Sequence, residues 1–197
     1  MSRVAKFAAA AVLSVTLSGF VCADANAAVT VFGGDFAQAC YTAAKNDLAR
    51  DENVLDCSRA IETEQLMGHD LAGTYVNRGA LYMSQGRWGA AEQDFAEALR
   101  IEPKLAEALV NMGAAEIGMH RNRDGVDAIT QGLALGSSEP EKAYYNRALG
   151  YEALGDVASA YNDYLKAAAL KPAWTAPREE LVRFHTQPAG GGASPGG

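Results

Sequence analysis

The chain has 197 residues, a length that suits one ordinary domain or one short array of repeats. Acidic side chains outnumber basic ones by 24 to 17, and the net charge of −7 argues against nucleic acid or an anionic membrane surface as the partner. Apolar residues make up 49% of the sequence, so the chain has enough of them to build a buried core.

Residues 1–27 have the three parts of a secretory signal peptide. A basic start precedes an apolar run over residues 7–21, and two small-residue sites of the form Ala-x-Ala follow, ending at Ala25 and Ala27. An uncleaved anchor is the alternative, but a run of about 15 residues is short for a membrane span. Lipid attachment at Cys22 is a second alternative, which the bulky residues before it disfavour. We therefore expect cleavage near Ala27 and a mature chain that is periplasmic or secreted, without membrane insertion.

The middle of the chain contains an internal repeat. Residues 75–103 align with residues 144–172 without gaps, and a third, more degraded copy lies between them. Copies about 34 residues apart are typical of a solenoid built from helix–turn–helix units. The positions that match in the two outer copies are Tyr75 and Tyr144, Asn77 and Asn146, Arg78 and Arg147, Tyr82 and Tyr151, Gly86 and Gly155, Ala91 and Ala160, Asp94 and Asp163, Ala98 and Ala167, and Pro103 and Pro172.

Each copy predicts two antiparallel helices. In the first copy, small and aromatic residues recur at helical spacing before Gly86, which tolerates the left-handed conformation that ends a helix. The same spacing returns from Trp88 to Ile101, and the alternation of small and large residues suits close packing of the two helices. Pro103 then ends the unit, because proline cannot continue a helix interior.

This pattern resembles the tetratricopeptide repeat, which is a helix pair with Gly, Ala, aromatic and Pro residues at fixed offsets. The resemblance implies an all-α fold, a short α-solenoid of tetratricopeptide helix–turn–helix repeats with a C-terminal capping helix. The expected parts of the chain are a signal peptide (1–27), an N-terminal helix pair that resembles a partial repeat (28–73), three tetratricopeptide repeats (74–171), the capping helix (172–186) and a disordered, Gly-rich tail (187–197).

Two cysteines remain in the expected mature chain, an even number in an oxidising compartment. Cys40 and Cys57 fall on two predicted helices, 36–46 and 51–64, whose short connection allows the sulfur atoms to lie across from each other. A redox-active pair is the alternative, but the spacing is not Cys-x-x-Cys and nothing nearby is basic enough to activate a thiolate. We therefore expect a structural disulfide.

Charged residues in the outer copies predict two ion pairs. Arg78 and Arg147 stand where the repeat usually has an apolar residue, and Asp94 and Asp163 follow 16 residues later on the facing helix. The middle copy lacks both members of the pair together, with methionine and alanine in their places. We expect the pairs Arg78–Asp94 and Arg147–Asp163 within the outer repeats.

The sequence has no recognisable catalytic constellation. Its three histidines are scattered, and no set of residues has the spacing of metal ligands. A nucleophile elbow, a phosphate loop and a dinucleotide fingerprint are all missing. We therefore expect a protein that is not an enzyme and needs no metal and no cofactor.

In tetratricopeptide repeats the first helices of successive units line a concave groove where peptides commonly bind, and the resemblance implies such a groove here. Family members that clamp a terminal carboxylate use Lys, Asn and Arg on this face. Here the face is mostly apolar, which favours a hydrophobic peptide or an amphipathic helix. Tyr145 is the expected hot spot, because it combines a large ring with a polar tip. The expected lining is Val76, Ala80, Met83, Val110, Ala114, Ile117, Tyr145 and Leu149.

Two features of the groove allow other interpretations. The lead-in 29–32 is a candidate to fill part of it from within the chain. Asn77, Asn111 and Asn146 recur at one place in every unit. We expect these asparagines to make structural hydrogen bonds between repeats and not to contact a ligand.

The sequence thus predicts a protein–protein interaction module or scaffold of the cell envelope, which binds a partner peptide or helix with an apolar segment in its concave groove. The alternative is a structural or assembly factor that packs permanently into an envelope complex.

Overall fold

The computed structural model describes residues 26–186, and every regular element in this range is an α-helix. The all-α prediction is therefore confirmed. The predicted C-terminal tail and all but the last two residues of the predicted signal peptide lie outside the described residues. The helices are α1 (Asp35–Lys45), α2 (Asp51–Thr63), α3 (Gly68–Ser84), α4 (Trp88–Ile101), α5 (Ala106–Gly118), α6 (Asn122–Ala134), α7 (Pro140–Ala153), α8 (Val157–Leu170) and α9 (Ala176–Thr186).

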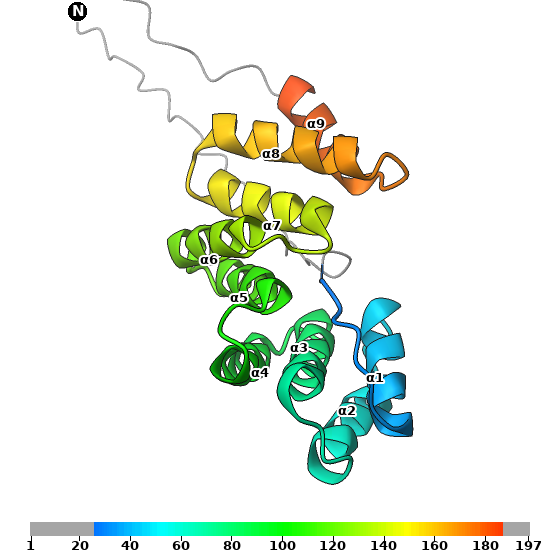
Figure 1. Ribbon diagram of the computed structural model, residues 1–197. Helices are drawn as coiled ribbons and strands as arrows, with labels where there is room; N and C mark the ends of the chain where they lie inside the picture. Colours follow the sequence, from blue (N-terminus) through cyan, green and yellow to red (C-terminus); the bar gives the residue numbers. More distant parts are fainter. Residues whose placement is uncertain (1–25, 187–197) are drawn as a thin grey trace, which may run out of the picture.

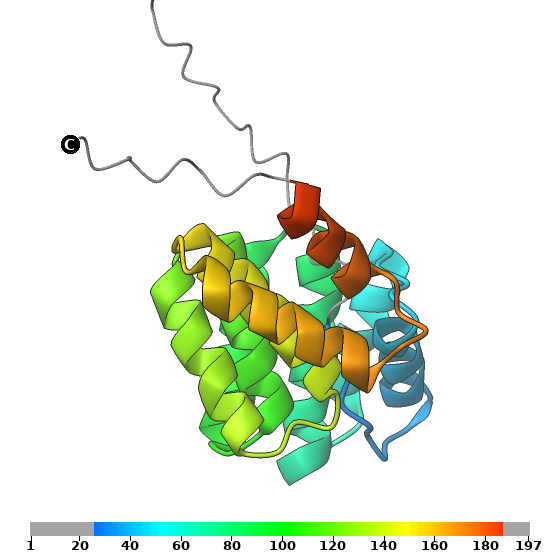
Figure 2. The same cartoon turned by 90° about the horizontal axis from the view of Figure 1, so that it is seen from above.

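The helices stack as consecutive pairs (Figure 1). Helix α3 packs on α4, α5 on α6 and α7 on α8, while α1 and α2 form a further pair that contacts α3. The first helices of successive pairs also meet, because α1 contacts α3, α3 contacts α5 and α5 contacts α7. They line one side of the array, and α9 covers α8 at its end (Figure 2). This arrangement is the predicted α-solenoid.

Glycines let the paired helices approach closely. A Cβ atom on Gly79 of α3 would lie only 2.5 Å from Cε1 of Phe95 on α4. In the next pair, a Cβ atom on Gly113 or on Gly125 would lie 2.5 Å from the carbonyl oxygen of the other glycine. Side chains at these positions would force the helices apart, which explains why small residues recur there. Gly86 follows α3 with a φ of +72°, the left-handed conformation predicted for it.

The structure corrects two predicted boundaries. The first repeat was expected from residue 74, but its first helix α3 already begins at Gly68. The start of this helix contains Gly68 and Gly73, but Ala72 is fully buried, so packing outweighs the weak helix propensity of the two glycines. The capping helix was expected from residue 172 but begins at Ala176, after a turn in which the N–H of Trp174 donates to the carbonyl of Lys171 at 3.0 Å.

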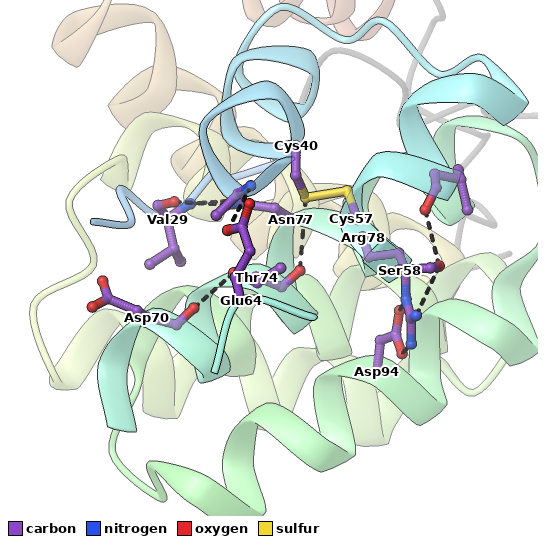
Figure 3. Close-up of a disulfide and its surroundings, with 12 residues drawn as sticks. Val29, Cys40, Cys57, Ser58, Glu64, Asp70, Thr74, Asn77, Arg78 and Asp94 are labelled. Carbon is purple, nitrogen blue, oxygen red and sulfur yellow. Dashed lines mark hydrogen bonds and ion pairs between the residues drawn. A yellow bond between two sulfur atoms is a disulfide. The ribbon is translucent and has the colours of Figure 1, made fainter. Parts of the chain in front are cut away.

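Cys40 of α1 and Cys57 of α2 are joined by a disulfide, with 2.09 Å between the sulfur atoms. Both cysteines are fully buried. Figure 3 shows the bond beside α3, where the sulfur of Cys40 lies 4.0 Å from the carbonyl oxygen of Thr74. The cross-link therefore holds α1 and α2 together at the place where this pair packs against the first repeat.

Bidentate ion pairs join the helices of the two outer repeats. Nε and Nη2 of Arg78 donate to the two carboxylate oxygens of Asp94 at 2.8 and 2.7 Å (Figure 3). Arg147 and Asp163 repeat the arrangement between α7 and α8, at 2.7 and 3.1 Å. Burial raises the pKa of Asp94, and the neighbouring guanidinium opposes that rise. The carboxylate thus depends on Arg78 to stay ionised inside the protein.

We expect Arg78→Met to lower the free energy of unfolding by about 3 kcal/mol or more, because it leaves Asp94 buried without a counter-charge. The double variant Arg78→Met, Asp94→Ala copies the residues of the middle repeat, Met112 and Ala128, and should recover part of the loss.

The stability of the single variant should also depend on pH. Removing Arg78 raises the pKa of Asp94 further, so the folded single variant binds a proton that the unfolded chain does not. Its stability should therefore rise as the pH falls. Urea unfolding at pH 7 and at about pH 5 measures both effects; equal losses in the single and double variants would contradict the expectation.

Candidate functional site

The concave side of the solenoid holds an extended stretch of the chain, residues 26–32, which we call the N-terminal segment (Figure 1, dark blue). From Ala27 onward its side chains alternate in exposure. Ala27, Val29 and Val31 are 0, 4 and 1% exposed, whereas Thr30 and Phe32 are exposed. A period of two is that of an extended chain with one face against a surface. The lead-in identified in the sequence therefore occupies the groove.

Two asparagines hold the main chain of this segment. Oδ1 of Asn77 accepts the N–H of Val29 at 2.8 Å, and its Nδ2 donates to the carbonyl of Val29 at 2.8 Å (Figure 3). Asn111 does the same for Ala27, at 3.0 and 2.7 Å. Both asparagines are fully buried. A step of one repeat along the solenoid thus corresponds to a step of two residues along the segment, and this correspondence fixes its register.

Three further side chains reach main-chain atoms of the segment, and Asn26 and Thr30 also form hydrogen bonds through their own side chains. Nζ of Lys142 on α7 donates to the carbonyl of Asn26 at 2.7 Å. Asp70 of α3 accepts the N–H of Phe32 at 2.7 Å, and Gln38 of α1 donates to the carbonyl of Val31 at 2.7 Å. Side chains from α1, α3, α5 and α7 therefore hold the segment by its backbone. Such contacts do not depend on which side chains the segment carries.

These hydrogen bonds correct the expectation for the recurrent asparagines. Asn77 and Asn111 were expected to link one repeat to the next, but they bind residues 48 and 84 positions away. Asn146 lies at the equivalent place on α7 and is also fully buried. The asparagines at positions 77 and 111 therefore recur because each holds the main chain of the N-terminal segment.

The predicted groove lining is largely covered. Val76, Met83 and Ala114 are 0, 2 and 0% exposed, and they belong with Val29 to one apolar cluster. Ala80 is 2% exposed, and its carbonyl accepts a hydrogen bond from Nδ2 of Asn26 at 3.3 Å. These residues form the floor beneath the segment, so they are not an open surface.

Other members of the predicted lining do not face the groove as a continuous surface. Val110 is fully buried and packs with Ile129 of α6, and Ile117 packs against the same cluster. Closely placed glycines explain this, because a Cβ on Gly132 would lie 2.7 Å from Val110 and one on Gly125 would lie 2.6 Å from Ile117. Both residues thus fill the space between helices. A charged side chain in place of Val110 would therefore disrupt the core.

The aromatic end of the predicted lining forms a separate cluster near α9. Tyr145 is half-buried, and its ring centre lies 4.9 Å from that of Trp174 and 5.5 Å from that of Tyr164. Leu149 is 6% exposed and belongs to the same cluster. Tyr145, the expected hot spot, therefore supports the packing of the cap and lies among aromatic side chains.

A cavity of about 340 Å³ lies beside the start of the segment, lined in part by Asn26, Lys142, Lys171 and Trp174. Two of its lysines are paired, Lys142 with a glutamate at 2.8 Å and Lys171 with another at 3.3 Å. Within residues 26–186 there is no group of His, Cys, Asp and Glu side chains that could hold a metal ion. The same range contains no helix long and apolar enough to cross a membrane.

Comparison with protein families gives two matches to models described as tetratricopeptide repeat, over residues 72–105 and 141–173. Among curated proteins, the chain is similar to the lipoprotein NlpI homolog of Haemophilus influenzae, with 27% identity over 114 residues. The matched region covers 57% of this chain and 36% of that protein, so the chain spans about a third of the length of this relative.

Solved structures of tetratricopeptide-repeat proteins share the fold. The first such domain of RPAP3 bound to the HSP90 peptide SRMEEVD has 21% identity and a TM-score of 0.53, over 58% of this chain and 90% of that one. MamA from Desulfovibrio magneticus RS-1 has 18% identity and a TM-score of 0.56, over 77% of this chain and 87% of that one. At these low sequence identities, the similarity to the solved structures shows a shared fold.

We expect Asn77→Ala to loosen the N-terminal segment, because it removes two hydrogen bonds worth about 1 kcal/mol each and leaves the main chain of Val29 without partners. Chymotrypsin should then cut more rapidly after Phe32, which is 80% exposed but held in an extended conformation. Mass spectrometry of timed digests gives the rate. Asn46→Ala is the matched control, since Asn46 is exposed and bonds only to its own helix at Thr42. Equal cutting rates in the two variants would contradict the clamp.

Proposed function

Since this chain is a tetratricopeptide-repeat protein, we propose that it functions in protein–protein interaction by holding an extended segment of a partner where its own residues 26–32 lie. The observation that supports this proposal is the pair of clamps at Asn77 and Asn111. Each pairs with both main-chain groups of one residue of the segment. Because every peptide carries these groups, another extended segment can receive the same four hydrogen bonds.

The clamps favour an extended partner over the amphipathic helix considered from the sequence. In an α-helix the main-chain N–H and C=O groups already bond to each other, four residues apart. They are not available to the side-chain amides of Asn77 and Asn111. The spacing also fits, since the two clamped residues of the segment are separated by a single residue.

The start of α1 has an anchor outside the N-terminal segment, although Gln38 of α1 also bonds to the carbonyl of Val31. The carboxylate of Glu64, which follows α2, accepts the N–H groups of Gly34, Phe36 and Ala37 at 2.9, 2.8 and 3.2 Å. These bonds hold the start of α1 independently of residues 26–32. The tethered segment acts at an effective concentration on the order of mM, so a free partner must make tighter contacts to replace it.

An extracytoplasmic setting is part of the proposal. The pattern of residues 1–27 supports export. A disulfide between Cys40 and Cys57 suits an oxidising compartment. The similar protein from Haemophilus influenzae is described as a lipoprotein, which supports the same setting.

A permanent place in an envelope complex is the second candidate. Apolar side chains on the last repeat favour it, because Val157, Leu165 and Leu170 of α8 are 54, 43 and 52% exposed. A stable monomer on gel filtration of the exported protein would argue against this candidate.

Binding in trans tests the proposed function. The variant Val29→Asp, Val31→Asp, which we call the opened chain, places two charges where the segment is buried and should release it. A labelled peptide of sequence NAAVTVF should then bind to the opened chain. We expect Asn77→Ala in the opened chain to weaken this binding about 30-fold, the equivalent of two lost hydrogen bonds of about 1 kcal/mol each. Fluorescence anisotropy measures the affinity, and circular dichroism checks that the helices are retained. No binding to a folded opened chain would overturn the proposal.

The site of signal-peptide cleavage is a separate prediction. Cleavage after Ala27 would remove the residue that Asn111 holds, whereas cleavage after Ala25 keeps it. We expect the mature protein to begin at Asn26, two residues before the start predicted from the sequence. Intact-mass measurement and N-terminal sequencing of the exported protein decide this point. A mature chain that begins at Ala28, or at a lipidated Cys22, would contradict the expectation.

A further inference from the structure

The groove contacts two side chains of the segment at a single glycine. A Cβ atom on Gly73 of α3 would lie 2.7 Å from Cγ1 of Val29 and 2.7 Å from Cγ1 of Val31. The third-nearest atom, at 3.3 Å, is the Cβ of Val29. The nearest neighbours of this glycine thus all belong to the N-terminal segment. Any side chain on α3 at this place would meet the segment before it met the rest of the fold.

The clamp and the glycine act on the same residues. Asn77 follows Gly73 by four positions on α3, so both lie on one face of the helix. Because Asn77 fixes the main chain of Val29, the side chain of Val29 is directed onto the glycine. Val31 comes two residues later on the same face of the extended segment and also reaches the glycine. The register of the backbone therefore determines which two side chains meet there.

The other repeats differ at this position. Glu107 and Lys142 stand four residues before Asn111 and four before Asn146, where the first repeat has Gly73. Oε1 of Glu107 accepts hydrogen bonds from Ser138, and Lys142 binds the main chain of the segment. The space that admits two branched side chains is thus a property of the first repeat. The residue clamped by Asn111 in the second repeat, Ala27, is small and fully buried.

From this geometry we propose that the groove selects extended partner segments of the pattern small–x–Val–x–Val, with Gly73 as the residue that determines specificity. This inference rests on the proposed function and names the class of its partner. The small residue lies at Asn111, the first valine at Asn77, and the two valines enclose Gly73. Of the residues between them, Thr30 is exposed and free to vary, whereas Ala28 is half-buried and packs against the cluster around Cys40.

Two peptides of equal composition test the pattern. In NAAVTVF the alanine and both valines lie at alternate positions, whereas in NVVAATF the valines are adjacent, so no register places both against Gly73. We expect the opened chain to bind NAAVTVF about tenfold more tightly than NVVAATF, the scale of one misplaced branched side chain in a packed site.

Substitution of Gly73 is the second part of the test. Gly73→Ala in the opened chain should weaken binding of NAAVTVF about tenfold. It should affect NAAATAF much less, because that peptide leaves room for the added methyl group. Gly89→Ala on α4 is the matched control, since Gly89 is also helical and an added Cβ there meets nothing within 4 Å. Alanine is the better helix former at both sites, so weaker binding in one variant cannot come from a weaker helix.

The outcomes separate this inference from the proposed function. Preference for NAAVTVF that disappears in Gly73→Ala and persists in Gly89→Ala supports both. Equal binding of NAAVTVF and NVVAATF overturns the pattern, because the groove would then recognise only the main chain of the peptide. Equal loss in both glycine variants overturns the role of Gly73. Failure of the folded opened chain to bind either peptide overturns the proposed function together with the inference.

Discussion

The structure depends on one requirement, that a buried main chain without secondary structure must find hydrogen-bond partners. Residues 26–32 lie against a wall of helices, whose own backbone groups already bond to each other. Only side chains can then supply the missing partners. Asparagine suits the task because its amide offers one acceptor and a donor in the same arrangement as a peptide group. Asn77 and Asn111 supply these partners, and their positions fix where every side chain of the segment lies.

The repeat architecture could be predicted from the sequence because local patterns specify it. Gly79 and Phe95 meet at a helix crossing, and each recurs as a small or bulky residue at the same place in other units. The arginine and aspartate of the outer repeats occur together and are missing together, which is how a contact between facing helices appears in a sequence. The two cysteines fall on adjacent helices with a short connection. In each case the partners are close along the chain or are related by the repeat.

The site could be predicted only in part, because its partners are distant along the chain. The regular recurrence of Asn77 and Asn111 is visible in the sequence, but the residues that they bind lie 48 and 84 positions away. Helical spacing in a sequence also does not determine which neighbouring surface each residue of a helix faces. Val110 was therefore assigned to the groove, although the absence of a side chain at Gly132 draws it between the helices. The role of Gly73 could not be predicted either, because its nearest neighbours belong to a segment outside its own repeat.

The central claim is that the N-terminal segment is a displaceable occupant of the groove and not an inseparable part of the core. Native-state hydrogen exchange at the amides of Ala27 and Val29 tests it most directly, because both N–H groups are bonded only through the asparagine clamps. We predict that these two amides exchange through a local opening, with a free energy clearly below that of amides in the middle of α3 and α5. Exchange of all four sites at the same free energy, with the same dependence on denaturant, would contradict the account, since the segment would then leave the groove only when the whole solenoid unfolds.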